Sequence, residues 1–259
     1  MRRHLLPLLA IITTALPAQE SRQLLPVPDK LVVLTFDDAV SNHATFVGPL
    51  LKKLGFGATF YVCEFPPDFE TNKEQYMTWD QIKSLNDMGF EIGNHTGHHK
   101  HLNGLKKEQL VEEIEFIEKR CAGHGIPRPV TFCYPAYVTS PAALATLTEH
   151  GYLFAREGHG RAYDPAKDNP LLIPSVSLSG SKTEPFYNAL KQAANGSIVV
   201  FTFHGIPEHT HPWVNTPPEI FEQYMRYLAD NHFTVISVRD LGRYVDPSKA
   251  RSAIVEQKH

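Results

Sequence analysis

The sequence has few cysteines, little excess charge and only a short apolar run at its start. The three cysteines, Cys63, Cys121 and Cys133, allow at most one disulfide bond, and none of them belongs to a CxxC metal-binding pair. The formal net charge is -3 at pH 7, which excludes the strongly basic character of nucleic-acid-binding domains. With 42% hydrophobic and 20% charged residues among 259, the composition is that of a globular protein with a sizeable core, not of a disordered chain.

The N-terminus has the features of an export signal. Basic residues precede an apolar run from Leu5 to about Leu16, which is shorter than the roughly 20 residues that span a bilayer. We therefore expect a signal peptide rather than a membrane anchor, with no stable membrane span after cleavage and a secreted, periplasmic or cell-envelope location. The expected divisions are a signal peptide over residues 1–18, a linker over 19–28, one domain over 29–246 and a tail over 247–259.

Short apolar runs alternate with helix signatures along the whole domain. One such signature is a capping box, in which Thr78 is followed three residues later by Gln81. Another is the segment 105–121, an amphipathic helix whose acidic residues, Glu113 among them, are expected on a solvated face. Alternation of this kind indicates parallel strands joined by helices, and seven or eight such units predict a closed single β/α barrel with seven or eight parallel strands. The expected strands cover residues 30–36, 57–62, 90–93, 129–135, 152–155, 171–176, 197–203 and 233–238.

Polar residues follow several of the expected strands. In a β/α barrel the loops after the carboxyl ends of the strands gather on one face, where active sites are built. Residues distant in sequence would therefore converge there. Asp37 and Asp38 follow the first strand, His95 and His99 the third, Tyr134 the fourth and His204 the seventh.

His95 and His99 have the spacing of metal ligands. If the segment forms a helical turn, residues four apart face the same way, so both imidazoles can hold one ion. A carboxylate from another strand end would be the third ligand and would leave a fourth position open, as in catalytic zinc sites. Two histidines and one carboxylate also suit non-haem iron.

Asp37 and Asp38 are predicted to have different tasks. On an extended backbone adjacent side chains point in opposite directions, so one carboxylate could bind metal while the other faces the substrate as a general base. The alternative is that the pair caps the following loop. The histidines favour the metal-site interpretation.

Three motifs together resemble those of a known family. TFDD at residues 35–38, HTGHH at 95–99 and FTFHG at 201–205 are similar to the motifs of the polysaccharide deacetylases, the NodB-homology domain of carbohydrate esterase family four. Their order and spacing cover roughly residues 29–245. The resemblance implies a distorted β/α barrel and a divalent metal, usually zinc, with cobalt or nickel as alternatives.

The resemblance also implies a role for each matching residue. His204 could otherwise be a histidine of the core, but its place after a buried strand favours catalysis. By position, the resemblance implies a general base at Asp37, a general acid at His204, an oxyanion-binding N–H at Ala136 and metal ligands at Asp38, His95 and His99.

Two family motifs are altered in this chain. In many members an arginine stands where this chain has Cys133, and the fourth motif is missing near FAREGHGR. We hypothesise that Arg156 replaces the missing arginine as the partner of Asp37 and keeps that carboxylate ionised. The alternative is that Arg156 faces solvent.

Three aromatic residues are candidates to stack on a sugar ring. They are Tyr134, Tyr137 and Trp213, and each could equally be ordinary packing. Trp213 lies in a polar, proline-rich loop and is expected to be the most exposed, while His209 and His211 nearby are expected at the rim.

The expected function is removal of N-acetyl groups from a glycan of the N-acetylglucosamine type. One alternative is a hydrolase of the same fold that acts on a non-sugar amide or on O-acetyl esters such as acetylxylan. Another, of a different class, is a glycan-binding protein that has lost turnover. The expected partner is an acetylated glycan and no nucleic acid, and the oligomeric state is left open.

Overall fold

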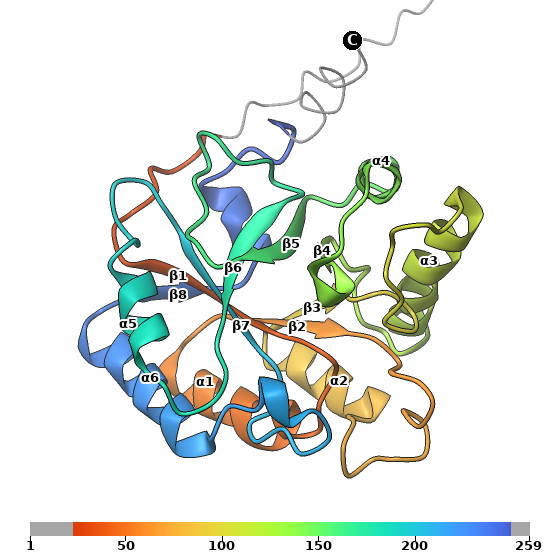
Figure 1. Ribbon diagram of the computed structural model, residues 1–259, viewed down its shortest axis with the longest axis horizontal. Coiled ribbons are helices and arrows are strands. Elements are labelled where there is room, and N and C mark those ends of the chain that lie inside the picture. The colour runs from red at the N-terminus through yellow and green to blue at the C-terminus, as the bar shows by residue number, and fades with distance from the viewer. Residues whose placement is uncertain (1–22, 250–259) are drawn as a thin grey trace, which may run out of the picture.

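Eight parallel strands form the centre of the computed structural model, which describes residues 23–249 (Figure 1). The strands are β1 (Leu31–Phe36), β2 (Thr59–Val62), β3 (Glu91–Asn94), β4 (Thr131–Cys133), β5 (Phe154–His159), β6 (Ile173–Ser177), β7 (Val199–Phe203) and β8 (Thr234–Ile236). Their order is β2-β3-β4-β5-β6-β7-β1-β8, and a further pairing of β1 with β2 closes the first seven into a barrel. The prediction of a distorted β/α barrel is confirmed.

The distortion of the barrel lies beside β1. On one side β1 pairs with β7 along nearly its whole length, from Val32 to Phe36. On the other side its first residues pair with β8, and only its last two, Thr35 and Phe36, pair with β2. The end of β1 is therefore held between β2 and β7, next to the face where the following residues emerge.

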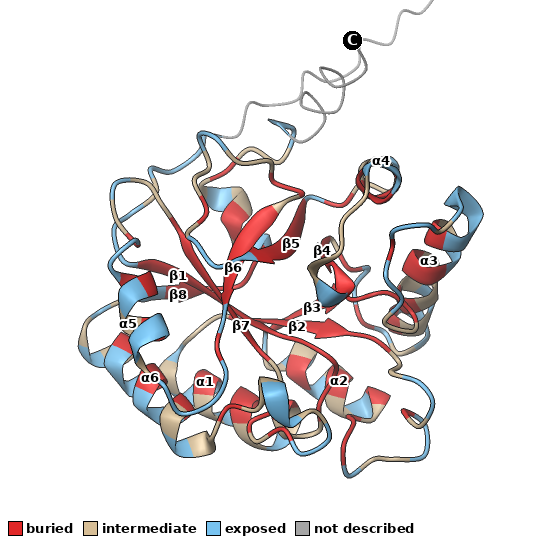
Figure 2. Cartoon of the chain, viewed as in Figure 1, coloured by how far each residue is buried: buried red, intermediate tan, exposed pale blue. Residues whose placement is uncertain are grey.

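Helices cover the outside of the barrel. Their buried faces point toward the strands and their exposed faces point outward (Figure 2). The predicted capping box is confirmed, because Gln81 N donates to Thr78 Oγ1 at 3.2 Å and Thr78 N donates to Gln81 Oε1 at 2.8 Å. The α-helices are α1 (Gly48–Leu54), α2 (Trp79–Asp87), α3 (Lys107–Gly123), α4 (Pro141–Glu149), α5 (Glu184–Leu190) and α6 (Pro218–Asp230). A π-helical turn, η1 (His43–Val47), and three 3-10 turns, η2 (Pro135–Tyr137), η3 (Pro212–Val214) and η4 (Arg239–Arg243), complete the regular structure.

Side chains of β1 alternate between two cores. Val32, Leu34 and Phe36 pack in the large cluster that includes helix residues, whereas Leu31 and Val33 belong to a second cluster in which strand residues predominate. Because side chains of a strand alternate between its faces, Val33, Thr35 and Asp37 form one series. The face of β1 that carries Val33 and Thr35 thus ends in the carboxylate of Asp37.

β5 begins later and ends later than expected. The sequence predicts a strand over residues 152–155, whereas β5 covers Phe154–His159. The difference arises because Arg156 and Glu157, which look like loop residues in the sequence, are 0% and 7% exposed within the strand. Arg156 is thus part of the barrel wall instead of following it.

The sequence predictions also concern the three cysteines and the two ends of the chain. All three cysteines lie among the described residues, and each is buried and free of a disulfide. Within residues 23–249, no helix combines the length and the apolar character that a membrane crossing requires. The signal peptide expected over residues 1–18 and most of the expected tail lie outside the described residues.

Glu91 ties together the amino-terminal ends of three strands. Its carboxylate accepts hydrogen bonds from Thr59 Oγ1 at 2.7 Å, Thr131 Oγ1 at 2.7 Å and the backbone N–H of Arg239 at 2.8 Å. Burial raises the pKa of Glu91 above its ordinary value of 4.5, against the opposing effect of these hydrogen bonds. Glu91 is therefore a stabilising link at the barrel end opposite the strand-end loops.

This link makes stability depend on pH. The pKa of Glu91 is higher in the folded than in the unfolded protein, so the protonated carboxyl group favours folding. This contribution to the free energy of unfolding is full below the unfolded-state pKa and is lost as the pH rises through the folded-state pKa. The free energy of unfolding of the wild type, relative to Glu91→Gln, should fall as the pH rises above about 4.5. Urea unfolding over a pH series measures this. Glu222→Gln, on an exposed position of α6, is the matched control, and equal pH slopes for wild type and Glu91→Gln would contradict the assignment.

Candidate active site

The end of β1 presents two carboxylates to one pocket. Asp37 continues the pairing with β7, since its N–H donates to the carbonyl of Phe203 at 3.0 Å. Asp38 and Ala39 then adopt left-handed backbone conformations with φ of 72° and 52°. The expectation of an extended backbone for the pair is therefore wrong at Asp38. A turn, and not strand alternation, separates the two side chains, and both line the same cavity.

The His95–His99 segment is a loop after β3. The expected helical turn is wrong, because Thr96 and His99 have positive φ values of 64° and 52°. The loop is nevertheless ordered: Asn94 Oδ1 accepts from Thr96 N at 2.9 Å, and Thr96 Oγ1 accepts from Lys100 N at 3.1 Å. It brings the two imidazole rings to a centroid distance of 4.8 Å. The two histidines converge as predicted, but by a different local geometry.

A buried carboxylate on α3 supports this loop. Glu113 accepts a hydrogen bond from His98 N at 2.9 Å and forms an ion pair with Lys100 Nζ at 2.7 Å. Its exposed fraction is only 2%, although the helix pattern predicts that it belongs to a solvated acidic face. Glu113 therefore fixes the backbone between His95 and His99 from outside the pocket.

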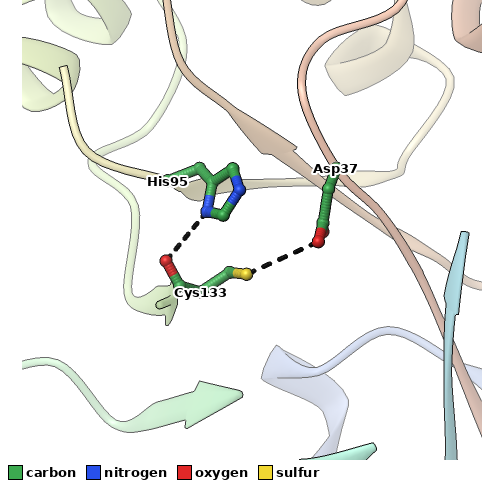
Figure 3. Close-up of side chains that lie close together, drawn as sticks. All are labelled: Asp37, His95 and Cys133. Carbon is green, nitrogen blue, oxygen red and sulfur yellow. Dashed lines mark hydrogen bonds between the residues drawn. The ribbon is translucent and has the colours of Figure 1, made fainter. Parts of the chain in front are cut away.

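Asp38, His95 and His99 have the geometry of a metal site. Asp38 Oδ1 lies 3.4 Å from His95 Nε2 and 3.5 Å from His99 Nε2. His95 Nδ1 donates to the carbonyl oxygen of Cys133 at 2.9 Å (Figure 3), which leaves the lone pair on Nε2 for a ligand. Among the described residues, no donor hydrogen-bonds the buried Asp38 Oδ1. An unpaired buried oxygen facing two imidazole nitrogens fits a divalent cation.

The electrostatics of the three residues agree with this assignment. Burial, reinforced by the neighbouring His95, lowers the pKa of His99 to about 4, so its ring is neutral. Burial alone would raise the pKa of Asp38, but the close approach of His95, together with His204 and His99, holds it below its ordinary value. For His95, burial is outweighed by Cys133 and Asp38, which raise its pKa, so binding of an ion would displace a proton from that ring.

Arg156 lies in the barrel interior against Asp37. In the β4–β5 register Arg156 stands opposite Cys133, and its Nη2 contacts both Asp37 Oδ2 and Cys133 Sγ. Its Nη1 donates to Thr202 Oγ1 at 2.8 Å. Because Arg156 is 0% exposed, the alternative that it faces solvent is wrong. The contact with Asp37 is the one that the sequence hypothesis requires.

This contact governs the charge of Asp37. Burial by itself would raise the pKa of Asp37, but the Arg156 guanidinium, with help from His95 and His204, lowers it below the ordinary value. Cys133 Sγ lies 3.7 Å from Asp37 Oδ2 (Figure 3), and burial raises the pKa of its thiol. Cys133 is thus a packed thiol beside the carboxylate.

His204 lies between the two aspartates. Its Nε2 is 4.0 Å from Asp37 Oδ2 and 4.0 Å from Asp38 Oδ2. The register of β1 and β7 explains this placement, because Phe36 is the partner of Phe203 and the next residues on each strand are Asp37 and His204. An imidazole and a carboxylate are therefore held side by side at the carboxyl end of the barrel.

The pocket above these residues has a volume of about 240 Å³. Ala136, Tyr137 and Trp213 line it, and Trp213 is the most exposed large apolar side chain of the described residues at 72%. The Tyr134 ring is 0% exposed and its hydroxyl donates to Leu171 O at 3.0 Å. Tyr134 therefore contributes to the wall of the pocket, but its ring packs against Phe132 in the core and is not free to stack on a sugar.

Four further lining residues were not predicted. Phe65 packs its ring against His99 at 4.7 Å and against His211 at 5.2 Å between centroids. Phe65 follows β2 and Ser177 ends β6, so inspection of these two strand ends would have found both. His211 was expected at the rim and instead lines the pocket. The unpredicted lining residues are Phe65, Ser177, His211 and Val214.

Backbone strain concentrates around this pocket. Ten non-glycine residues of the described chain have positive φ, and six of them lie in the loops after β1, β3 and β4. Each such conformation costs roughly 1–3 kcal/mol and tends to occur at functional sites. The six are Asp38, Ala39, Thr96, His99, Ala136 and Tyr137.

Comparisons with known proteins agree with the geometry. A family model described as "Polysaccharide deacetylase" matches residues 25–155. The peptidoglycan-N-acetylglucosamine deacetylase of Bacillus cereus is 28% identical over 132 residues, which cover 49% of this chain and 56% of that protein. The chain spans about half the length of the curated relatives that it matches, 43% and 56%.

Solved structures share the fold at low sequence identity. The chitin deacetylase of the fungal pathogen Colletotrichum lindemuthianum has a TM-score of 0.58 and 19% identity, covering 86% of this chain and 91% of that one. A family 4 acetyl xylan esterase from Clostridium thermocellum, in complex with a cobalt ion, has a TM-score of 0.58 and 22% identity, covering 85% and 96%.

The metal-site assignment predicts binding of one Zn²⁺ per chain. His99→Ala should weaken this binding by more than the roughly 10- to 100-fold typical of changes around a metal site, because it removes a ligand. Affinity should also rise with pH, since the ion displaces a proton from His95. Calorimetric titration measures both effects. His209→Ala, at an exposed position outside the pocket, is the control, and equal affinities of His99→Ala and wild type would contradict the site.

Proposed function

The chain belongs to the polysaccharide deacetylase family, and on that premise we propose that it is a metal-dependent hydrolase that removes N-acetyl groups from an N-acetylglucosamine-type glycan. The observation that carries the proposal is the convergence of Asp37, Asp38, His95, His99 and His204 on one pocket at the carboxyl end of the barrel. A divalent ion held by Asp38, His95 and His99, most simply Zn²⁺, would supply a Lewis acid that polarises the acetyl carbonyl.

Asp37 is suited to be the general base. Its Oδ1 is buried and has no hydrogen-bond donor among the described residues, while Arg156 contacts its Oδ2. The guanidinium keeps the carboxylate ionised, and an ionised carboxylate can accept the proton of an attacking water. One oxygen is thus occupied by Arg156, and the other is available to the proton.

His204 is suited to be the general acid. Its Nε2 lies 4.0 Å from Asp37, close enough for the two groups to serve opposite sides of one reacting carbon. A protonated Nε2 would deliver its proton to the departing nitrogen of the sugar. The backbone N–H of Ala136, in the left-handed turn that lines the pocket, would bind the developing oxyanion.

The acetylated sugar would enter between Tyr137 and Trp213. Both side chains line the pocket, and flat aromatic faces suit the apolar faces of a pyranose ring. The names of the relatives support a glycan substrate, because they include a peptidoglycan-N-acetylglucosamine deacetylase and a chitin deacetylase. An acetyl xylan esterase of the same fold supports O-acetylated xylan as a second candidate.

Acetate release tests the function. Zinc-loaded protein should release acetate from at least one of poly-N-acetylglucosamine, chitin oligosaccharides and peptidoglycan, with acetylxylan as the ester alternative. Asp37→Asn should lower the rate at least about 100-fold, because general-base catalysis contributes roughly that factor. Asp230→Asn, at an exposed position of α6, is the control for a change of one carboxylate. Absence of acetate from every N-acetylated glycan would overturn the proposal.

Arg156→Met tests the charge relation with Asp37. Without the guanidinium, burial would raise the pKa of Asp37, and the carboxylate needed as base would form only at higher pH. The acidic limb of the pH-rate profile should therefore shift upward. Arg161→Met, which removes an arginine paired with Asp168 at the surface, should leave the limb in place. An unchanged limb in Arg156→Met would show that Arg156 does not set the charge of the base.

A further inference from the structure

A fully buried histidine lies directly behind the catalytic face. His43 begins the π-helical turn η1 and is 0% exposed. Its Nε2 lies 2.9 Å from the carbonyl oxygen of His204. A carbonyl oxygen only accepts hydrogen bonds, so Nε2 carries the proton and donates it. The side chain of His43 thus holds the backbone of the residue that we assign as general acid.

The preceding residue holds the same segment at two more points. Asn42 Nδ2 donates to the carbonyl of Pro207 at 2.6 Å, and Asn42 Oδ1 accepts from the N–H of Ile206 at 2.9 Å. Together with His43, these bonds join the loop after β1 to the start of the loop after β7. The residues that follow the two aspartates therefore fix the residues that follow His204.

The imidazole of His204 has no comparable support of its own. Its Nδ1 is buried, and no side chain or backbone group among the described residues hydrogen-bonds it. Catalytic histidines are commonly oriented by a carboxylate on the second nitrogen, and within the described part of the chain no carboxylate hydrogen-bonds His204 Nδ1. The position of its ring must then follow from the position of its backbone.

We propose that Asn42 and His43 are positioning residues that hold His204 in place as the general acid, acting through its backbone instead of through its ring. This inference rests on the proposed deacetylation and names two residues outside the motifs that carry the family resemblance. The three hydrogen bonds replace the orienting side chain that the free Nδ1 of His204 lacks.

The surroundings of His43 make it a rigid donor. Its ring packs against Phe36 at 5.5 Å and against Phe60 at 5.6 Å between centroids, and its own carbonyl accepts the N–H of Gly48 within the π turn. Burial lowers the pKa of His43 to about 4, so the ring is neutral at neutral pH and keeps its single proton on Nε2. π turns recur at functional sites, and this one aims a side chain between two strand ends.

The experiment compares substrates whose leaving groups differ in how much they need a proton from His204. The alkoxide of an alkyl acetate and the amine of an N-acetylglucosamine oligosaccharide are poor leaving groups unless they are protonated. The phenolate of para-nitrophenyl acetate leaves without a proton. In His43→Leu, kcat on the poor leaving groups should fall about 100-fold with little change in KM, since a misplaced acid costs about that factor. On para-nitrophenyl acetate the loss should stay below about 3-fold.

Further variants separate positioning from folding. His43→Gln retains an N–H donor of similar reach and should recover most of the lost rate. Asn42→Ala removes the other two bonds from a less buried position and should show the same dependence on leaving group. His124→Leu, which loses a ring contact with Trp79 outside the pocket, is the matched control. Affinity for Zn²⁺ should be unchanged in every variant, because no metal ligand is altered.

Each result decides the proposal. Equal losses on good and poor leaving groups, or no loss on the poor ones, would overturn the positioning role. If the wild type hydrolyses esters but no N-acetylated glycan, and His43→Leu still shows the leaving-group dependence, the positioning role stands and the glycan function fails. A wild type that hydrolyses none of the three substrates would overturn both.

Discussion

The buried ion pair between Arg156 and Asp37 links the interior of the barrel to its chemistry. An arginine that is 0% exposed needs a compensating charge, because an unpaired buried cation costs several kcal/mol. Asp37 supplies that charge from β1, while Thr202 on β7 takes a second guanidinium N–H at 2.8 Å. The guanidinium also lies 5.5 Å from the centroids of the Tyr61 and Tyr137 rings. The carboxylate proposed as the general base is thus also the counter-ion of the buried Arg156.

The remaining parts of the site follow from register and turns. Parallel pairing of β1 with β7 puts Asp37 beside His204, and left-handed residues immediately after the strands redirect Asp38 and His99 toward each other. Strained backbone of this kind persists only where the surroundings hold it. Here Glu113 holds the histidine loop from the side of α3. The stability of the barrel therefore sustains loops that would not adopt these conformations alone.

Sequence reasoning recovered the barrel and the converging strand ends, because apolar runs and helix caps are local patterns. It also predicted the contact of Arg156 with Asp37. It misplaced β5, since charged residues inside a strand are read as loop, and it placed Glu113 in solvent, since helix periodicity does not report a partner on another element. The turn at Asp38 and the loop at His99 escaped prediction because positive φ at non-glycine residues has no clear sequence signal.

The altered motif has a geometric explanation. The family resemblance places an arginine where this chain has Cys133, and in the register of β4 and β5 the residue opposite Cys133 is Arg156. Neighbouring parallel strands carry side chains at the same level of the barrel, so a cation can move from one strand to the next and still reach the same carboxylate. The small Cys133 side chain leaves room for the guanidinium, which contacts both its sulfur and Asp37. The positive charge next to Asp37, the proposed base, is therefore retained in space although its place in the sequence differs.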